Sequence, residues 1–177
     1  MSITRRSFGG LIGASFGTVA MRGFALSKDS NACFTHGVAS GDPLKDRVIL
    51  WTRVIPCDGF DRGLDVQWQV AADKGFAKVT SSGHFFTDAS RDFTVKVDAS
   101  SLEPGRQYFY RFISKGVVSP TGVTRTLPVG EVTQFRIGIA SCSNYPQGFF
   151  NAYRDMASQD LDAVVHLGDY IYEYPDG

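Results

Sequence analysis

The sequence has no excess of charge of either sign. Its 177 residues include 18 Lys and Arg and 18 Asp and Glu, so the formal net charge is zero. Binding to nucleic acid or to an anionic membrane usually depends on a basic surface, and the overall composition does not provide one. Hydrophobic residues make up 43% of the sequence and charged residues 20%, which is the balance of a globular protein.

The sequence also lacks a hydrophobic run long enough to cross a membrane. The stretch from Gly9 to Met21 is rich in Gly, Ala and Ser and is shorter than the about 20 apolar residues that a transmembrane helix needs, so we expect no stable membrane span. Arg5 and Arg6, followed by Ser-Phe, resemble a bacterial twin-arginine export signal, and a small-x-small site for cleavage ends at Ala25.

This pattern predicts a signal peptide over residues 1–25, the twin-arginine translocase as a partner during export, and a periplasmic or extracellular location. An amphipathic first helix is the alternative. It is disfavoured because the stretch has no polar face to place against solvent.

Cysteine is scarce, with residues at only three positions: Cys33, Cys57 and Cys142. In an exported protein Cys33 and Cys57 could form a disulfide and leave Cys142 as the odd thiol. Three free, partly buried cysteines are the alternative, and the sequence leaves both open.

Short strands separated by turns are predicted over residues 30–128. Apolar and polar residues alternate in VQWQV from Val66 and FTVKVD from Phe93, and β-branched and aromatic residues fill RVILWTRV from Arg47 and YFYRFI from Tyr108. Gly, Pro and Asp turn signals separate these segments. The spacing predicts a sandwich of two antiparallel sheets.

One turn makes the prediction more specific. In SLEPGRQYFYRF, from Ser101, residues Leu102, Pro104 and Tyr108 are arranged as in the tyrosine corner of immunoglobulin and fibronectin III sandwiches, where a Tyr hydrogen-bonds to upstream backbone. A Pro-Gly turn that precedes an aromatic strand by chance is the alternative. The neighbouring strand candidates favour an immunoglobulin/fibronectin III-like sandwich.

After a linker at residues 128–131 the pattern changes. QFRIGIASCS predicts an apolar strand from Phe135 to about Ala140, GFFNAYRDMASQ predicts a helix from Gly148, and LDAVVHLGD predicts a second apolar strand that ends near Leu167. Strand, helix and strand form a βαβ unit with parallel strands. We therefore expect residues 134–177 to begin an α/β domain.

Two chemically active residues follow the ends of these strands. Cys142 follows the first and Asp169 the second, at the edge where open parallel sheets bind ligands, and Tyr172 could turn back to the same point. Each has a structural alternative: Cys142 as a buried apolar residue, Asp169 as a helix N-cap, and Tyr172 as a rim aromatic. Together, a thiolate, a carboxylate and a phenolate favour a highly charged cation such as a ferric ion, and a metal-bound hydroxide there would attack a phosphate ester.

The histidines are expected to lie outside this site. His166 falls on the second apolar strand before Asp169, so we expect it to pack or hydrogen-bond within the sheet. His36 and His84 fall in the sandwich region and are expected in loops or on the surface.

The segments FTHGVASGDP, VILWTR, ASCSN and LGDYIYE together resemble the PhoD-like family of alkaline phosphatases and phosphodiesterases, which belongs to the calcineurin-like metallophosphoesterases. In this branch a Cys stands at the first motif position and a Tyr can replace the last acid of the second motif, as Cys142 and Tyr172 do here. The resemblance implies that Cys142, Asp169 and Tyr172 bind Fe³⁺, that Asp169 bridges to Ca²⁺, and that the enzyme hydrolyses small-molecule or polymeric phosphate esters with a metal-bound hydroxide or oxo nucleophile.

The resemblance also implies further Asn and His ligands, but the sequence has no histidine after His166. We therefore expect this chain to be the N-terminal portion of an exported alkaline phosphatase and to be inactive alone. A secreted β-sandwich binding module without catalysis is the alternative. It explains residues 33–127, but not a βαβ unit with Cys142 and Asp169 at its strand ends.

Overall fold

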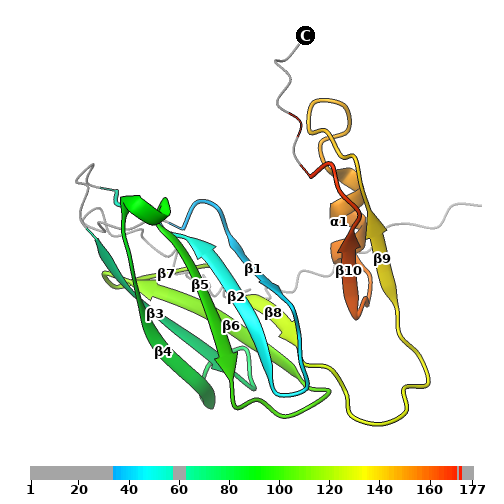
Figure 1. The fold of residues 1–177 in the computed structure, drawn as a ribbon, viewed down its shortest axis with the longest axis horizontal. Helices are drawn as coiled ribbons and strands as arrows, with labels where there is room; N and C mark the ends of the chain where they lie inside the picture. Colours follow the sequence, from blue (N-terminus) through cyan, green and yellow to red (C-terminus); the bar gives the residue numbers. More distant parts are fainter. Residues whose placement is uncertain (1–33, 58–62, 171, 173–177) are drawn as a thin grey trace, which may run out of the picture.

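A computed structural model describes residues 34–57, 63–170 and 172, which form mostly β-sheet (Figure 1). The strands are β1 (Val38–Gly41), β2 (Arg47–Arg53), β3 (Leu64–Ala71), β4 (Val79–Thr87), β5 (Thr94–Ser100), β6 (Gln107–Ser114), β7 (Val117–Val118), β8 (Gly122–Arg125), β9 (Ile137–Ala140) and β10 (Ala163–His166). The helical elements are the 3₁₀ helix η1 (Ala89–Arg91) and the α-helix α1 (Asn151–Ser158). The predicted signal peptide, including Arg5 and Arg6, lies outside the described residues.

Strands β1 to β8 form two antiparallel sheets. In one, β2 lies between β1 and β5. In the other, β3 lies between β4 and β6, and both β7 and β8 pair with β6. Hydrophobic side chains from both sheets meet in a single core, which contains Phe34, Val48, Leu50, Val54, Leu64, Val66, Val70, Val95, Ala99, Leu102, Tyr108, Tyr110 and Phe112. The two sheets therefore share the interior that the alternating pattern predicted.

Alternation of buried and exposed side chains is clearest in β2 and β6. In β2 the buried positions include Val48 and Leu50, and in β6 they include Tyr108, Tyr110 and Phe112. The hydroxyl oxygen of Tyr108 accepts a hydrogen bond of 2.8 Å from the N–H of Glu103, so the upstream hydrogen bond expected of a tyrosine corner is present.

The state of Cys57 excludes the alternative of three free cysteines. Cys57 is disulfide-bonded and Cys142 is a free thiol. Cys33, the partner that the sequence offers to Cys57, lies outside the described residues.

The β9–α1–β10 segment lies beside the two sheets and pairs with neither of them, and α1 lies next to its pair of parallel strands (Figure 1). Ala163 pairs with Ile137 and His166 with Ala140 in this ladder. A Cβ added to Gly138 would lie 2.8 Å from Cδ1 of Leu161 and 3.4 Å from Sδ of Met156, so the absence of a side chain in β9 permits close packing against α1 and the segment after it.

The helix begins later than predicted, at Asn151 rather than Gly148. Phe149 and Phe150 have φ angles of 50° and 53°, in the left-handed region, so they cannot continue a right-handed helix. The two strands are also shorter than predicted, since β9 begins at Ile137 and β10 ends at His166. Among the described residues, no helix has the length and apolar character needed to cross a membrane.

Candidate metal centre

The loops after β9 and β10 lie side by side because pairing continues past the strand ends. Leu167 N–H donates to the carbonyl oxygen of Ala140 at 2.9 Å, and Cys142 N–H donates to that of Gly168 at 3.3 Å. Cys142 and Asp169, 27 positions apart in sequence, are thereby brought to the same carboxyl edge of the parallel pair.

The three side chains predicted as ligands meet at one atom. Oδ2 of Asp169 accepts a hydrogen bond from Sγ of Cys142 at 3.3 Å and another from the hydroxyl of Tyr172 at 3.1 Å. Cys142 and Asp169 are exposed and Tyr172 is half-buried, so the cluster is open to solvent. The structure therefore groups Cys142, Asp169 and Tyr172, as the sequence predicted.

Unusual backbone conformations place two of these side chains. Cys142 and Asp169 have φ angles of 53° and 50°, and Gly168, directly before Asp169, has a φ angle of 122°. Left-handed conformations are uncommon for residues with a Cβ and persist where surrounding contacts impose them, often at functional sites. Here the contacts between the two loops supply that restraint.

The protonation of Tyr172 agrees with the hydrogen bond that its hydroxyl donates to Asp169. The pKa of Tyr172 is raised well above its ordinary value, chiefly by its side-chain interaction with Cys142, then by loss of solvent and by the hydrogen bond to Asp169. Tyr172 is thus a phenol at neutral pH, and its hydroxyl can donate to Asp169. A cation at this point would reverse the preference, because coordination favours the deprotonated thiol and phenol.

The donor set fits a highly charged cation. The thiol of Cys142 and the phenol of Tyr172 both donate to one carboxylate oxygen of Asp169. Once these two protons are displaced, the three side chains could present three anionic donors to a cation. No group of three or more His, Cys, Asp or Glu side chains suited to a metal ion occurs within residues 34–57, 63–170 and 172, so the fit depends on the tyrosine as the third donor.

A buried polar atom lies two residues beyond Cys142. Oδ1 of Asn144 is the buried side-chain oxygen or nitrogen that lacks a hydrogen-bond partner in the described part of the chain. An unpartnered buried amide oxygen is costly and is a signal of a missing ligand or solvent molecule. Asn144 was not predicted as a site residue, and the burial of its Oδ1 is the observation that identifies it.

Two family models match consecutive parts of the chain. The family model for the N-terminal domain of PhoD-like phosphatases matches residues 19–128, and the model for PhoD-like phosphatase itself matches residues 137–177. The chain belongs to the PhoD-like phosphatase family. Each part of this PhoD-like chain, the two sheets and the β9–α1–β10 segment, is covered by its own family match.

Two relatives of this PhoD-like chain support the assignment. Alkaline phosphatase D of Bacillus subtilis (strain 168) is 46% identical over 149 residues, which are 80% of this chain and 25% of that protein. A solved structure of PhoD aligns with a TM-score of 0.77 and 44% identity, over 85% of this chain and 30% of the other. The chain therefore spans about a quarter to a third of the length of these relatives.

His36 and His84 are exposed, as expected, and His166 lies on β10 but has its side-chain hydrogen-bond partners outside the sheet. His166 forms hydrogen bonds with Tyr153 and with the backbone of Gly168. His36 is exposed and lies near Arg53, and His84 is an exposed residue of β4 that pairs with Asp65.

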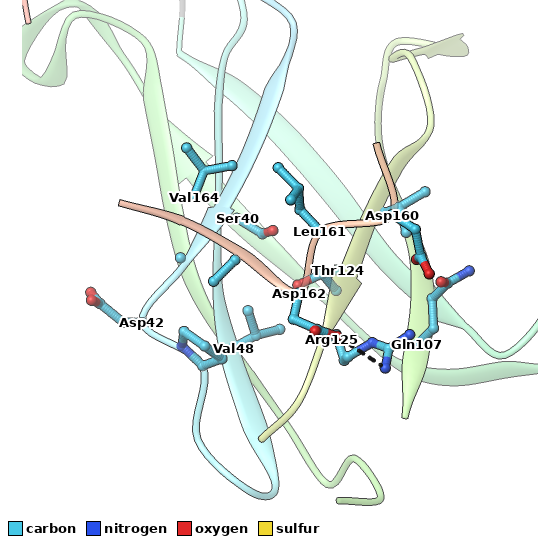
Figure 2. Close-up of a pocket in the computed structure, with 14 residues that line it drawn as sticks. Ser40, Asp42, Val48, Gln107, Thr124, Arg125, Asp160, Leu161, Asp162 and Val164 are labelled. Atoms are coloured by element: carbon cyan, nitrogen blue, oxygen red, sulfur yellow. Dashed lines mark ion pairs between the residues drawn. The ribbon is translucent and has the colours of Figure 1, made fainter. Parts of the chain in front are cut away.

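A cavity of about 420 Å³ lies at the opposite end of the parallel strands (Figure 2). Its walls come from β1, β2, β6 and β8 on one side and from residues 160–164 on the other, and an ion pair of 3.6 Å joins Arg125 to Asp162 across it. Because residues 160–164 contain the amino end of β10, the cavity lies away from Cys142 and Asp169, which follow the carboxyl ends. The Cys142–Asp169–Tyr172 cluster therefore lies outside this cavity.

Proposed function

We propose that this chain supplies the amino-terminal part of an exported, metal-dependent phosphoric ester hydrolase of the alkaline phosphatase D type. The observation that carries the proposal is the convergence of Cys142 and Tyr172 on Oδ2 of Asp169. Identity of 46% to an alkaline phosphatase D supports the reaction class, hydrolysis of phosphate esters. A binding module without catalysis would not need a thiol, a carboxylate and a phenol at the carboxyl edge of a parallel strand pair.

Within this proposal the chain has two parts and a leader. Residues 1–25 are a twin-arginine signal peptide, residues 30–128 an immunoglobulin/fibronectin III-like sandwich, and residues 134–177 the start of the metallophosphatase domain with its first βαβ unit. The shared core of the two sheets and the Tyr108–Glu103 hydrogen bond support the sandwich assignment. The parallel β9–β10 pair with α1 between them supports the βαβ assignment.

We assign the metal-holding role to Cys142, Asp169 and Tyr172, with Fe³⁺ as the first ion and Ca²⁺ as a neighbour bridged by Asp169. When bound, these ions would supply Lewis-acid polarisation of a phosphoryl oxygen. Cys142 and Tyr172 would each give up a proton on binding the ion, and Asp169 would contribute the carboxylate that now accepts both hydrogen bonds.

Iron binding tests the assignment through colour. Ferric iron bound by a tyrosinate absorbs visible light, so titration of the chain with Fe³⁺ should produce a charge-transfer band. Tyr172→Phe should abolish the band, and Asp169→Asn and Cys142→Ser should weaken iron binding. Tyr170→Phe is the matched control, because Tyr170 is a neighbouring exposed tyrosine outside the cluster. A band that survives in Tyr172→Phe, or iron-free protein by elemental analysis, would show that the assignment is wrong.

A further inference from the structure

His166, the last residue of β10, is fixed at both ring nitrogens. Its Nδ1 lies 3.3 Å from the N–H of Gly168, and its Nε2 lies 3.0 Å from the hydroxyl oxygen of Tyr153 on α1. A backbone N–H can only donate, so Nδ1 carries no proton and accepts. In the neutral imidazole Nε2 then carries the proton and donates it to the Tyr153 oxygen.

Gly168 is in turn held at both of its backbone polar groups. Its N–H donates to His166, and its carbonyl oxygen accepts the N–H of Cys142 at 3.3 Å. Gly168, which directly precedes Asp169, therefore connects the imidazole of His166 to the loop that carries Cys142. Its φ angle of 122° is one that a residue with a side chain rarely adopts, so Gly168 accepts this pair of contacts at little cost.

The imidazole ring itself has little room to turn. The rings of His166 and Tyr170 have centroids 4.9 Å apart with planes at 74°, and the ring of Tyr153 has its centroid 6.4 Å from that of His166. The Tyr153 ring packs in turn against Phe150, with centroids 5.2 Å apart. His166 is half-buried between these groups. With both nitrogens engaged and the ring packed on two sides, His166 does not offer a nitrogen to the Cys142–Asp169–Tyr172 cluster.

We propose that His166 is a positioning residue which, with Tyr153, holds the Gly168–Asp169 turn so that Oδ2 of Asp169 faces Cys142 and Tyr172. The shaping of the turn depends on the observed hydrogen bonds alone, and its consequence for metal affinity depends on the proposed function. Replacement of a residue that orients a metal ligand without touching the metal commonly lowers metal affinity about 10- to 100-fold.

Two substitutions at His166 separate the two ring nitrogens. His166→Asn places an amide oxygen near the position of Nδ1 and can still accept the Gly168 N–H. His166→Gln places its polar atoms near the position of Nε2 and loses that contact. Tyr153→Phe keeps the aromatic packing against Phe150 and removes only the partner of Nε2.

Two measurements on each variant of the chain are needed: hydrogen exchange of the Gly168 amide without metal, and the dissociation constant for Fe³⁺. We expect His166→Gln to speed exchange at Gly168 about tenfold, the change that follows loss of one ordinary hydrogen bond. We expect the same variant to weaken Fe³⁺ binding about 10- to 100-fold. His166→Asn should stay within about threefold of the unmodified chain in both measurements, and Tyr153→Phe should fall between the two.

The outcomes distinguish this inference from the proposed function. Equal exchange at Gly168 in the Asn and Gln variants, or an unprotected Gly168 amide in the unmodified chain, would overturn the positioning role whatever happens to iron. The expected exchange pattern in a chain that binds no Fe³⁺ would support the positioning of the turn and overturn the proposed metal centre.

Discussion

The hydroxyl oxygen of Tyr108 accepts a hydrogen bond of 2.8 Å from the backbone N–H of Glu103, which lies in the turn between β5 and β6. Thr126, directly after β8, holds the same turn, because its hydroxyl donates to the Glu103 carbonyl oxygen at 2.6 Å and accepts the Arg106 N–H at 3.1 Å. Tyr108 is 1% exposed and Thr126 is also 1% exposed, so both contacts are shielded from water. The turn that starts β6 is thus fixed by side chains from the core.

Tyr108→Phe should lower the free energy of unfolding by about 1–3 kcal/mol, because the ring stays in the core while the Glu103 N–H loses its partner. Urea denaturation followed by tryptophan fluorescence measures the change. Glu103→Ala is the control, since it keeps the N–H and removes an exposed carboxylate whose ion pair with Arg106 lies on the surface, and it should change stability by less than about 0.5 kcal/mol. Equal losses in the two variants would contradict the role of the Tyr108 hydroxyl.

Gly122→Ala on β8 should destabilise the second sheet by about 1–3 kcal/mol. An added Cβ would overlap the ring of Tyr110 on the paired strand β6, and Tyr110 is only 2% exposed, so the ring cannot move aside into solvent. Thermal unfolding monitored by circular dichroism tests the prediction.

Gly41→Ala on β1 is the matched control for Gly122→Ala. A Cβ at Gly41 would meet no atom within 4 Å, and Gly41 does not adopt a left-handed conformation. The melting temperature of Gly41→Ala should stay close to that of the unmodified chain. A Gly122→Ala variant of unchanged stability would mean that the Tyr110 ring has space that the structure does not show.

The sequence predicted the sheets where local pattern and burial agree. Strands β2, β3, β5 and β6 alternate clearly because one face of each contributes to the shared core. Strand β4 was not among the predicted segments, since Ser81, Ser82 and Gly83 interrupt any apolar alternation. It lies at the sheet edge and pairs with β3 through its backbone, and such pairing does not depend on side-chain pattern.

The candidate site was predictable in part. Cys142 and Asp169 were found because the ends of parallel strands meet at one edge. Tyr172 was added because it could turn back to the same point and because the family resemblance includes it. The partners of His166 were not predictable, since Tyr153 reaches it only through the packing of α1 on the strands. The left-handed Phe149 and Phe150 that delay the helix were also missed, because aromatic residues at helical spacing give no signal of the turn in which both rings contact Tyr145.

Asp73→Ala should reduce the dependence of stability on acidic pH. The Asp73 carboxylate accepts the N–H groups of Lys78 at 2.9 Å and Ala77 at 3.1 Å, and these hydrogen bonds, Lys78 first, lower its pKa. A group with a lowered folded-state pKa stabilises the fold above its unfolded pKa of about 3.9, and that stabilisation is lost as pH falls through the folded-state pKa. The loss should therefore occur below about pH 5 and be smaller in Asp73→Ala.

Urea denaturation of Asp73→Ala at neutral pH and at several values below pH 5 measures this difference. Lys74→Ala is the control, because it lies in the same loop and leaves the carboxylate contacts in place, so its pH dependence should match that of the unmodified chain. Part of the slope should remain in Asp73→Ala, since hydrogen bonds from Ser90 and Arg53 also lower the pKa values of Asp88 and Asp92. An unchanged slope would show that the Asp73 contacts do not persist in solution.

The chain alone should not turn over a chromogenic phosphodiester in the presence of Fe³⁺ and Ca²⁺. In-line displacement at a two-metal site needs donors for both ions and groups that hold the attacking and leaving oxygens. The described residues gather one carboxylate, one thiol and one phenol, and the sequence contains no histidine after His166. A full-length relative assayed under the same conditions is the positive control, and turnover by this chain at a comparable rate would show that Cys142, Asp169 and Tyr172 suffice for hydrolysis.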